Sequence, residues 1–141
     1  MQSVRCTGDV RVAQSPEVAI RQFTAEGERA WVPGWDPTYP AGDADSSGTV
    51  FLTSADGRET IWVIVERTPT TAAYARVVPG VQAGAITVRC EPDGEATVAR
   101  VTYVLTALSD EAAEGLERFE ADYPAMMAEW ERLIAAQLPG A

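Results

Sequence analysis

The side chains that could carry out chemistry in this sequence are carboxylates, tyrosines, arginines, thiols and hydroxyls. Histidine, lysine and asparagine are absent from all 141 residues. Without histidine or lysine the chain cannot form a Ser-His-Asp triad, a histidine metal site, a Schiff base or a P-loop phosphate site. Any catalysis by this chain alone would therefore pair a carboxylate with Tyr, Arg, Ser, Thr or Cys.

Glu28, Glu66, Arg76 and Tyr103 are the candidates for such catalysis. A five-residue loop between two predicted strands would place Glu66 opposite Tyr74 and make Glu66 and Arg76 diagonal neighbours on one face. On the surface this ion pair would contribute about 0–1 kcal/mol, whereas in a dry cavity it would anchor a polar group of a ligand. Tyr103 is either a phenol in an apolar cavity wall or an ordinary core tyrosine.

Two tryptophans, Trp31 and Trp35, flank the turn residues Pro33 and Gly34. They either anchor this loop onto the sheet or the last helix, or line the mouth of a cavity, since a large amphipathic ring suits both roles. The two cysteines, Cys6 and Cys90, fit no Cys-x-x-Cys spacing and occupy apolar strand positions, which predicts buried free thiols.

A long C-terminal helix, residues 109–138, is the element that must support these residues. Ser109 is the expected N-cap, and Pro124 predicts a kink, or a break with a fresh start, near Tyr123. A helix of about 28 residues would be about 40 Å long, enough to cross a sheet. Its apolar stripe contains Leu116, Phe119, Tyr123, Met126, Met127, Trp130, Leu133, Ile134 and Leu138.

Six strands precede this helix. The first, Ser3–Gln14, leads into a short helix that starts at Ser15-Pro16-Glu17, and a second short helical piece runs from Thr24 towards Trp31. Residues 32–48 are rich in Pro and Gly and predict a loop. Short turns then separate the other strands, which predicts antiparallel hairpins. These strands are Thr49–Ser54, Glu59–Thr68, Ala72–Pro79, Ala83–Glu91 and Glu95–Ala107.

The inner face of the predicted sheet can be chosen for the last strand only. Along residues 97–107 the set that contains Tyr103 is the cleaner apolar face, so we expect it to face inward. Along residues 61–67 both faces are apolar, and alternation leaves the choice open. Strands segregated from one covering helix indicate an α+β fold, a curved six-stranded antiparallel sheet around the long helix.

Composition limits the partners. A net charge of −10 and a pI near 4.4 disfavour nucleic acids and anionic membranes. No run approaches the roughly 18 apolar residues of a membrane span, and no signal peptide is apparent, so we expect one cytoplasmic domain over residues 1–141. The acidic segment 43–50 supplies too few ligands for a calcium loop, and no pattern indicates a metal or cofactor.

The order of elements and three stretches resemble the START-like superfamily, also called SRPBCC, helix-grip or polyketide cyclase/dehydrase proteins. The stretches are Ser15–Ala19 with Phe23-Thr24, Glu28–Trp35, and Thr102-Tyr103 through Thr106–Ser109 into the long helix that carries Trp130. The resemblance implies a sheet that grips a C-terminal helix around a deep hydrophobic cavity, and it implies binding of lipids, sterols, hormones or polyketides. It carries over no catalytic residue.

We therefore expect binding of a small hydrophobic, lipid- or polyketide-like molecule between sheet and helix. One alternative is a cyclase-, dehydratase- or hydrolase-like enzyme, and another is a co-chaperone-like interaction module that uses the acidic surface or forms a homodimer. The expected cavity lining is Trp31, Trp35, Trp62, Glu66, Tyr74, Arg76, Tyr103, Phe119, Tyr123, Met127 and Trp130.

Overall fold

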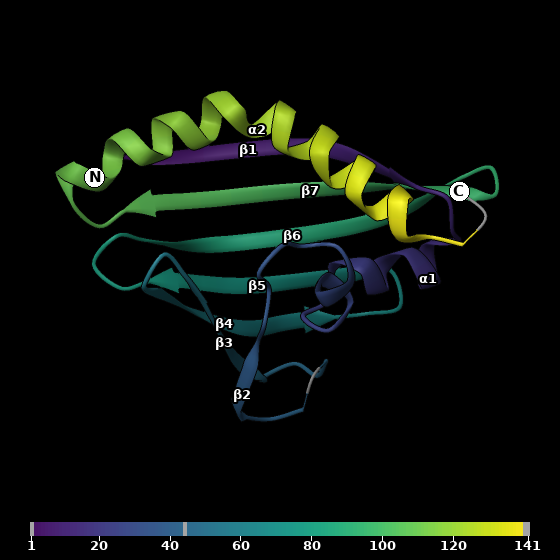
Figure 1. The fold of residues 1–141 in the computed structure, drawn as a ribbon, viewed down its shortest axis with the longest axis horizontal. Helices are drawn as coiled ribbons and strands as arrows, with labels where there is room; N and C mark the ends of the chain where they lie inside the picture. Colours follow the sequence, from purple (N-terminus) through teal and green to yellow (C-terminus); the bar gives the residue numbers. More distant parts are fainter. Residues whose placement is uncertain (1, 44, 140–141) are drawn as a thin grey trace.

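A curved antiparallel sheet forms the centre of the computed structural model, which describes residues 2–43 and 45–139 (Figure 1). The strand order is β1-β7-β6-β5-β4-β3-β2, so β2 to β7 follow as hairpins and β1 pairs with β7 at one edge. The strands are β1 (Ser3–Val12), β2 (Thr38–Ala41), β3 (Val50–Ala55), β4 (Arg58–Arg67), β5 (Thr71–Val78), β6 (Gln82–Asp93) and β7 (Ala96–Ala107).

The sheet has seven strands where the sequence predicted six. The additional strand is β2, within the stretch that was expected to be a loop. It pairs with β3 at Thr38–Leu52 and Ala41–Val50, and the register shifts between these two pairs. A four-residue strand that contains Pro40 has no alternation to reveal it, because its pairing depends on the edge of β3.

Three short helical turns connect β1 to β2: α1 (Pro16–Ala19), the 3₁₀ turn η1 (Ile20–Phe23) that continues it, and the 3₁₀ turn η2 (Gly27–Ala30). Pro16 begins α1, as predicted. The Thr24 hydroxyl donates to the Arg21 carbonyl at 2.8 Å and accepts from the Gly27 N–H at 3.0 Å, so it links η1 to the start of η2, although the N-cap residue of η2 is Glu26. This segment lies against β5 and β6 (Figure 1) and buries Ile20 and Phe23.

The C-terminal helix α2 (Asp110–Gln137) confirms the predicted long helix and its cap, because Ser109 Oγ accepts from the Ala112 N–H at 3.2 Å. The helix is unbroken at Pro124 and bends midway along its length (Figure 1). It runs beside β1 and β7 and does not cross the whole sheet. A Cβ on Gly8 of β1 would lie 2.7 Å from Met127 Cγ, so glycine permits this close approach.

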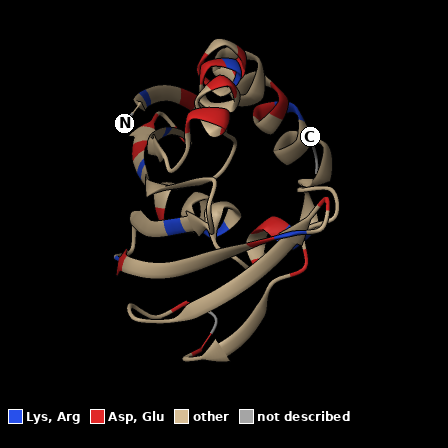
Figure 2. Cartoon of the chain, turned by 90° about the vertical axis from the view of Figure 1, so that its left-hand side faces the viewer, with Lys and Arg blue, Asp and Glu red and all other residues tan. Residues whose placement is uncertain are grey.

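Burial identifies the inner face of each strand. On β7, Thr97, Ala99, Val101, Tyr103, Leu105 and Ala107 are all buried, as predicted. On β4, Trp62 and Ile64 face inward, and Val65 is 60% exposed on the outer side. The acidic residues of α2 are exposed, and Figure 2 shows their positions in red along the helix.

The two cysteines are free and buried, as the sequence predicted. Burial raises the pKa of the Cys90 thiol to about 11, which makes it a small apolar side chain at neutral pH. Within residues 2–43 and 45–139, no helix has the length and apolar character that crossing a membrane requires.

Candidate functional site

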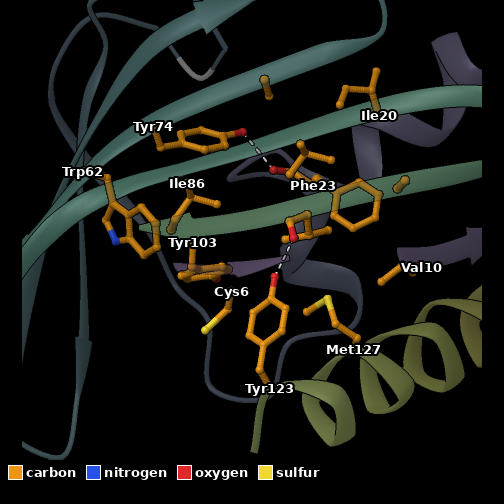
Figure 3. Close-up of a cluster of buried hydrophobic side chains, with 14 of the residues drawn as sticks. Cys6, Val10, Ile20, Phe23, Trp62, Tyr74, Ile86, Tyr103, Tyr123 and Met127 are labelled. Atoms are coloured by element: carbon orange, nitrogen blue, oxygen red, sulfur yellow. Dashed lines mark hydrogen bonds between the residues drawn. The ribbon is translucent and has the colours of Figure 1, made fainter. Parts of the chain in front are cut away.

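The gap between the sheet and the second half of α2 contains a small space that we call the inner cavity. The volume open to the centre of a water molecule is about 20 Å³, room for about one water. Figure 3 shows Trp62, Tyr74, Ile86 and Tyr103 turned from the strands into this gap. The lining residues are Phe23, Glu28, Phe51, Trp62, Tyr74, Ile86, Val88, Tyr103 and Trp130.

Aromatic rings fill most of the gap between the sheet and the second half of α2. The Trp130 ring centroid lies 5.3 Å from that of Trp31, 6.3 Å from Tyr103 and 6.4 Å from Phe23. The deep cavity that the family resemblance implied is therefore largely occupied by side chains here. The cause is the segment from α1 to η2, which packs Phe23 and Trp31 under the second half of α2.

Glu28 brings a carboxyl group to the inner cavity from η2. No hydrogen bond or ion pair joins this side chain to any of residues 2–43 and 45–139. Burial raises the pKa of the Glu28 carboxyl well above its usual range. Burial also raises the pKa of Tyr103 and Tyr74, and the nearby Glu28 charge adds to both shifts. The site thus combines a carboxyl and two phenols whose pKa values are all raised by burial.

Arg76 lies on the inner face of β5, opposite Trp62 in the pairing of β4 with β5. Its guanidinium carbon is 5.3 Å from the centroid of the Trp62 ring, and its Nη1 donates to Gln82 Oε1. Burial lowers the pKa of this guanidinium, while the nearby Tyr103 opposes the change. An arginine nevertheless stays protonated at physiological pH. The gap therefore holds a cation as well as a carboxyl.

A second space opens beside Arg76, between the β5–β6 turn and the first turns of α2; we call it the helix-start groove. Its volume is about 390 Å³. The Phe119 ring forms part of its wall and lies 5.2 Å from the Tyr103 ring, which lines the inner cavity. The groove residues are Arg58, Gly80, Val81, Gln82, Ser109, Glu111, Ala112, Gly115, Arg118 and Phe119.

The structure brings several of the expected lining residues together. Trp62, Tyr74, Tyr103 and Trp130 line the inner cavity, and Phe119 lines the helix-start groove. Arg76 lies between the two spaces, because it contacts Trp62 on one side and Gln82 on the other.

Four other expected residues line neither the inner cavity nor the helix-start groove but pack around them. Trp31 Nε1 donates to the Gln22 carbonyl at 2.9 Å, and Trp35 Nε1 donates to the Ala25 carbonyl at 2.7 Å, so both tryptophans anchor their loop. The Tyr123 hydroxyl donates to the Val101 carbonyl at 2.6 Å, a bond that Figure 3 marks. Met127 packs on β1 beside Gly8.

Glu66 does not line the gap, and its expected partnership with Arg76 is wrong. Its side chain is exposed, where its Oε1 accepts from the Thr71 hydroxyl at 3.3 Å. The pairing of β4 with β5 shifts between Ile64 and Glu66, so Tyr74 faces Ile64 and Arg76 faces Trp62. A β-bulge moves every later residue of a strand relative to its partner, and no turn-length argument anticipates it.

Sequence reasoning missed part of the lining, namely Phe23, Phe51, Ile86 and Val88. Phe51 lies directly opposite Trp62, and their rings stack at 5.5 Å. Knowing the inner face of β4 would have identified Phe51 through this register. No sequence pattern indicated Gln82, because only the structure shows that its amide oxygen accepts a hydrogen bond from Arg76.

Comparison with solved structures shows the fold. A Mesorhizobium loti protein matches with a TM-score of 0.71 and 15% identity over 96% of this chain and 99% of its own. Major latex-like protein 151 from Panax ginseng matches at 0.69 and 14%, over 97% and 99%. Norcoclaurine synthase from Thalictrum flavum, in complex with dopamine and hydroxybenzaldehyde, matches at 0.67 and 14%, over 97% and 89%.

No protein-family model matches the sequence, and neither does any curated protein. The structural matches cover nearly the whole chain, and they show that it has the helix-grip fold of START-like proteins. At this level of identity they show the fold alone.

Proposed function

We propose that this protein binds a small hydrophobic molecule in the gap between the sheet and α2, entering through the helix-start groove. The observation that carries the proposal is the groove itself, about 390 Å³ in volume and separated from the aromatic inner cavity by Phe119 and Tyr103. This volume falls in the range of small-molecule binding sites, roughly 300–1,000 Å³. The groove lining mixes polar and apolar side chains, so the apolar contacts of the ligand depend on the rings beside it.

The inner cavity alone is too small for such a molecule. The proposal therefore places the body of the ligand in the groove and requires the Phe119 ring to move so that one end reaches Tyr103 and Trp62. Side-chain rotations of this kind are common when proteins bind ligands. The complex of norcoclaurine synthase with two small aromatic molecules, on the same fold, supports aromatic compounds as the first ligands to test.

The experiment is a titration with naphthyl, phenyl and medium-chain acyl compounds, followed by tryptophan fluorescence and melting temperature. At about 100 times Kd a ligand should stabilise the protein by about 2.7 kcal/mol and raise Tm by several degrees. Failure of every compound to shift either signal at millimolar concentration would refute the proposal.

Gly115 offers a variant that closes the groove without disturbing the fold. A Cβ at this position meets only the Arg118 side chain, at 4.0 Å, so a side chain can start here without a clash, and Gly115→Phe also removes a glycine from a helix. We expect G115F to retain or raise Tm and to lose ligand binding. The matched control is Ala121→Phe on the exposed face of α2, which should bind ligands as the wild type does.

An enzyme is the second candidate function, and Glu28 is the observation that favours it. A carboxyl whose pKa is raised by burial is suited to general acid catalysis near neutral pH. Tyr103 faces the same cavity, although no hydrogen bond joins the two side chains. If this candidate holds, Glu28→Gln abolishes turnover of a bound ligand but leaves its Kd unchanged.

We also propose that the protein works in the cytoplasm. Two buried cysteines that form no disulfide support a reducing compartment. Cell fractionation followed by immunoblotting tests this, and recovery from an oxidising compartment would contradict it.

A further inference from the structure

We infer that the ligand is an anion, a hydrophobic carboxylic acid whose carboxylate pairs with Arg76. This inference rests on the proposed function and adds the chemical class of the ligand. It starts from the surroundings of Arg76, a partly buried cation beside the groove.

Arg76 differs from every other arginine of the chain. Five arginines, Arg11, Arg29, Arg67, Arg100 and Arg132, form ion pairs with Asp or Glu. Five more are exposed at the surface: Arg5, Arg21, Arg58, Arg89 and Arg118. Arg76 alone is removed from full exposure and has no carboxylate within ion-pair distance among residues 2–43 and 45–139.

A cation held away from water is costly unless an anion compensates it. The chain has 21 acidic residues and a net charge of −10, yet none of the described carboxylates reaches this guanidinium. The neutral Gln82 amide oxygen and the face of Trp62 hold it in place instead. A fixed guanidinium with free donors matches the planar geometry of a carboxylate.

The helix-start groove provides the approach for such an anion. Gln82 forms part of the groove wall, and the groove also contains Arg58 and Arg118, neither of which is ion-paired to a described residue. Glu111 is its one acidic residue. In an otherwise acidic protein, this groove is therefore a positively charged entry that attracts anions.

The apolar part of the ligand follows from the rings beside the guanidinium. Trp62 lies under Arg76, and Phe119 and Tyr103 pack against each other on the α2 side. A molecule with its carboxylate on Arg76 would place its apolar body against these rings.

The test compares two probes that differ only in charge, 2-naphthoate and neutral 2-naphthamide, by calorimetric titration at neutral pH. Wild-type protein should bind naphthoate at least about tenfold more tightly than naphthamide, since hydrogen bonds to charged groups are the stronger class. Arg76→Met keeps an apolar stem over Trp62 and removes the charge. It should weaken naphthoate binding by about tenfold or more and change naphthamide binding by less than about twofold.

Arg76→Lys and Arg5→Met complete the design. R76K retains the charge but lacks the planar guanidinium. Its affinity for naphthoate should lie between those of the wild type and R76M. R5M removes one exposed arginine on β1 and should bind both probes as the wild type does, which controls for net charge. All variants are checked by thermal unfolding, and R76M should melt no lower than the wild type because an uncompensated charge is removed.

The outcomes separate the inference from the function on which it rests. If wild-type protein binds both probes equally, or if R76M weakens both equally, the assignment of Arg76 as an anion site is overturned while ligand binding stands. If neither probe nor any other compound binds, the proposed function itself fails, and the inference fails with it.

Discussion

The two ends of the gap between the sheet and α2 are built differently. Under the second half of α2, the segment from α1 to η2 fills the space with Phe23 and Trp31, which pack against Trp130. Under the first half no such segment intervenes, and the helix-start groove remains open. We call the space under the second half of α2 the closed end and the space under the first half the open end. The closed end contains the carboxyl of Glu28, and the open end contains the guanidinium of Arg76.

This difference separates stability from binding within one gap. Close packing of rings stabilises the closed end, where the remaining space admits about one water. At the open end Leu116 and Tyr123 are buried as well, but the groove beside them leaves the side chains of Gln82 and Arg118 available to a ligand.

The largest effect should come from removing the central ring of the closed end. Trp130→Ala should lower the free energy of unfolding by about 3 kcal/mol, the lower end of the range for a large aromatic, because the ring is half-buried. At the open end, Phe119→Ala should cost about 1–2 kcal/mol, within the usual range for a single substitution, because this half-buried ring faces the groove. Urea unfolding measures both. Equal losses would mean that the two ends are packed alike.

A smaller loss of stability should follow from removing the hydrogen bond that ties the segment from α1 to η2 to the sheet. The buried Tyr74 hydroxyl donates to the Phe23 carbonyl at 2.8 Å (Figure 3). Tyr74→Phe leaves that carbonyl without its partner and should cost about 1–2 kcal/mol by urea unfolding. Tyr39→Phe serves as the control. The Tyr39 hydroxyl donates to the exposed Glu26, so its removal should lower the free energy of unfolding by less than about 0.5 kcal/mol. A similar loss in both variants would argue against this anchor.

The smallest effect concerns the charge at the closed end and depends on pH. Burial holds the folded pKa of Glu28 well above 4.5, the usual value of a glutamate, so over the pH range between the two the folded protein keeps this proton while the unfolded chain loses it. Stability of the wild type should therefore fall as pH rises from about 4.5 through the raised folded pKa. The groups whose charges couple to Glu28, Tyr74 and Tyr103, stay neutral throughout this window.

Glu28→Gln removes this titration. Its melting temperature should match that of the wild type below about pH 4.5 and exceed it at pH 8, in thermal scans across the range. Parallel curves for the two proteins would show that the Glu28 carboxyl titrates normally and is solvated.

Local patterns in the sequence determined the elements on which the fold depends. The three- and four-residue spacing from Leu116 to Ile134 and the cap at Ser109 predicted α2, and the alternation along β7 predicted its inner face. Such signals are sufficient because each depends on residues within a few positions of one another.

Only the tertiary structure decided the site. The bulge beside Val65 fixed which residues of β4 and β5 face each other, and this excluded Glu66 and placed Arg76 beside Trp62. The packing of Phe23 and Trp31 decided how much of the gap stayed open, and η2 placed Glu28 in the inner cavity. Strand register and cavity volume depend on side chains far apart in the chain, so no periodicity within one segment could specify them.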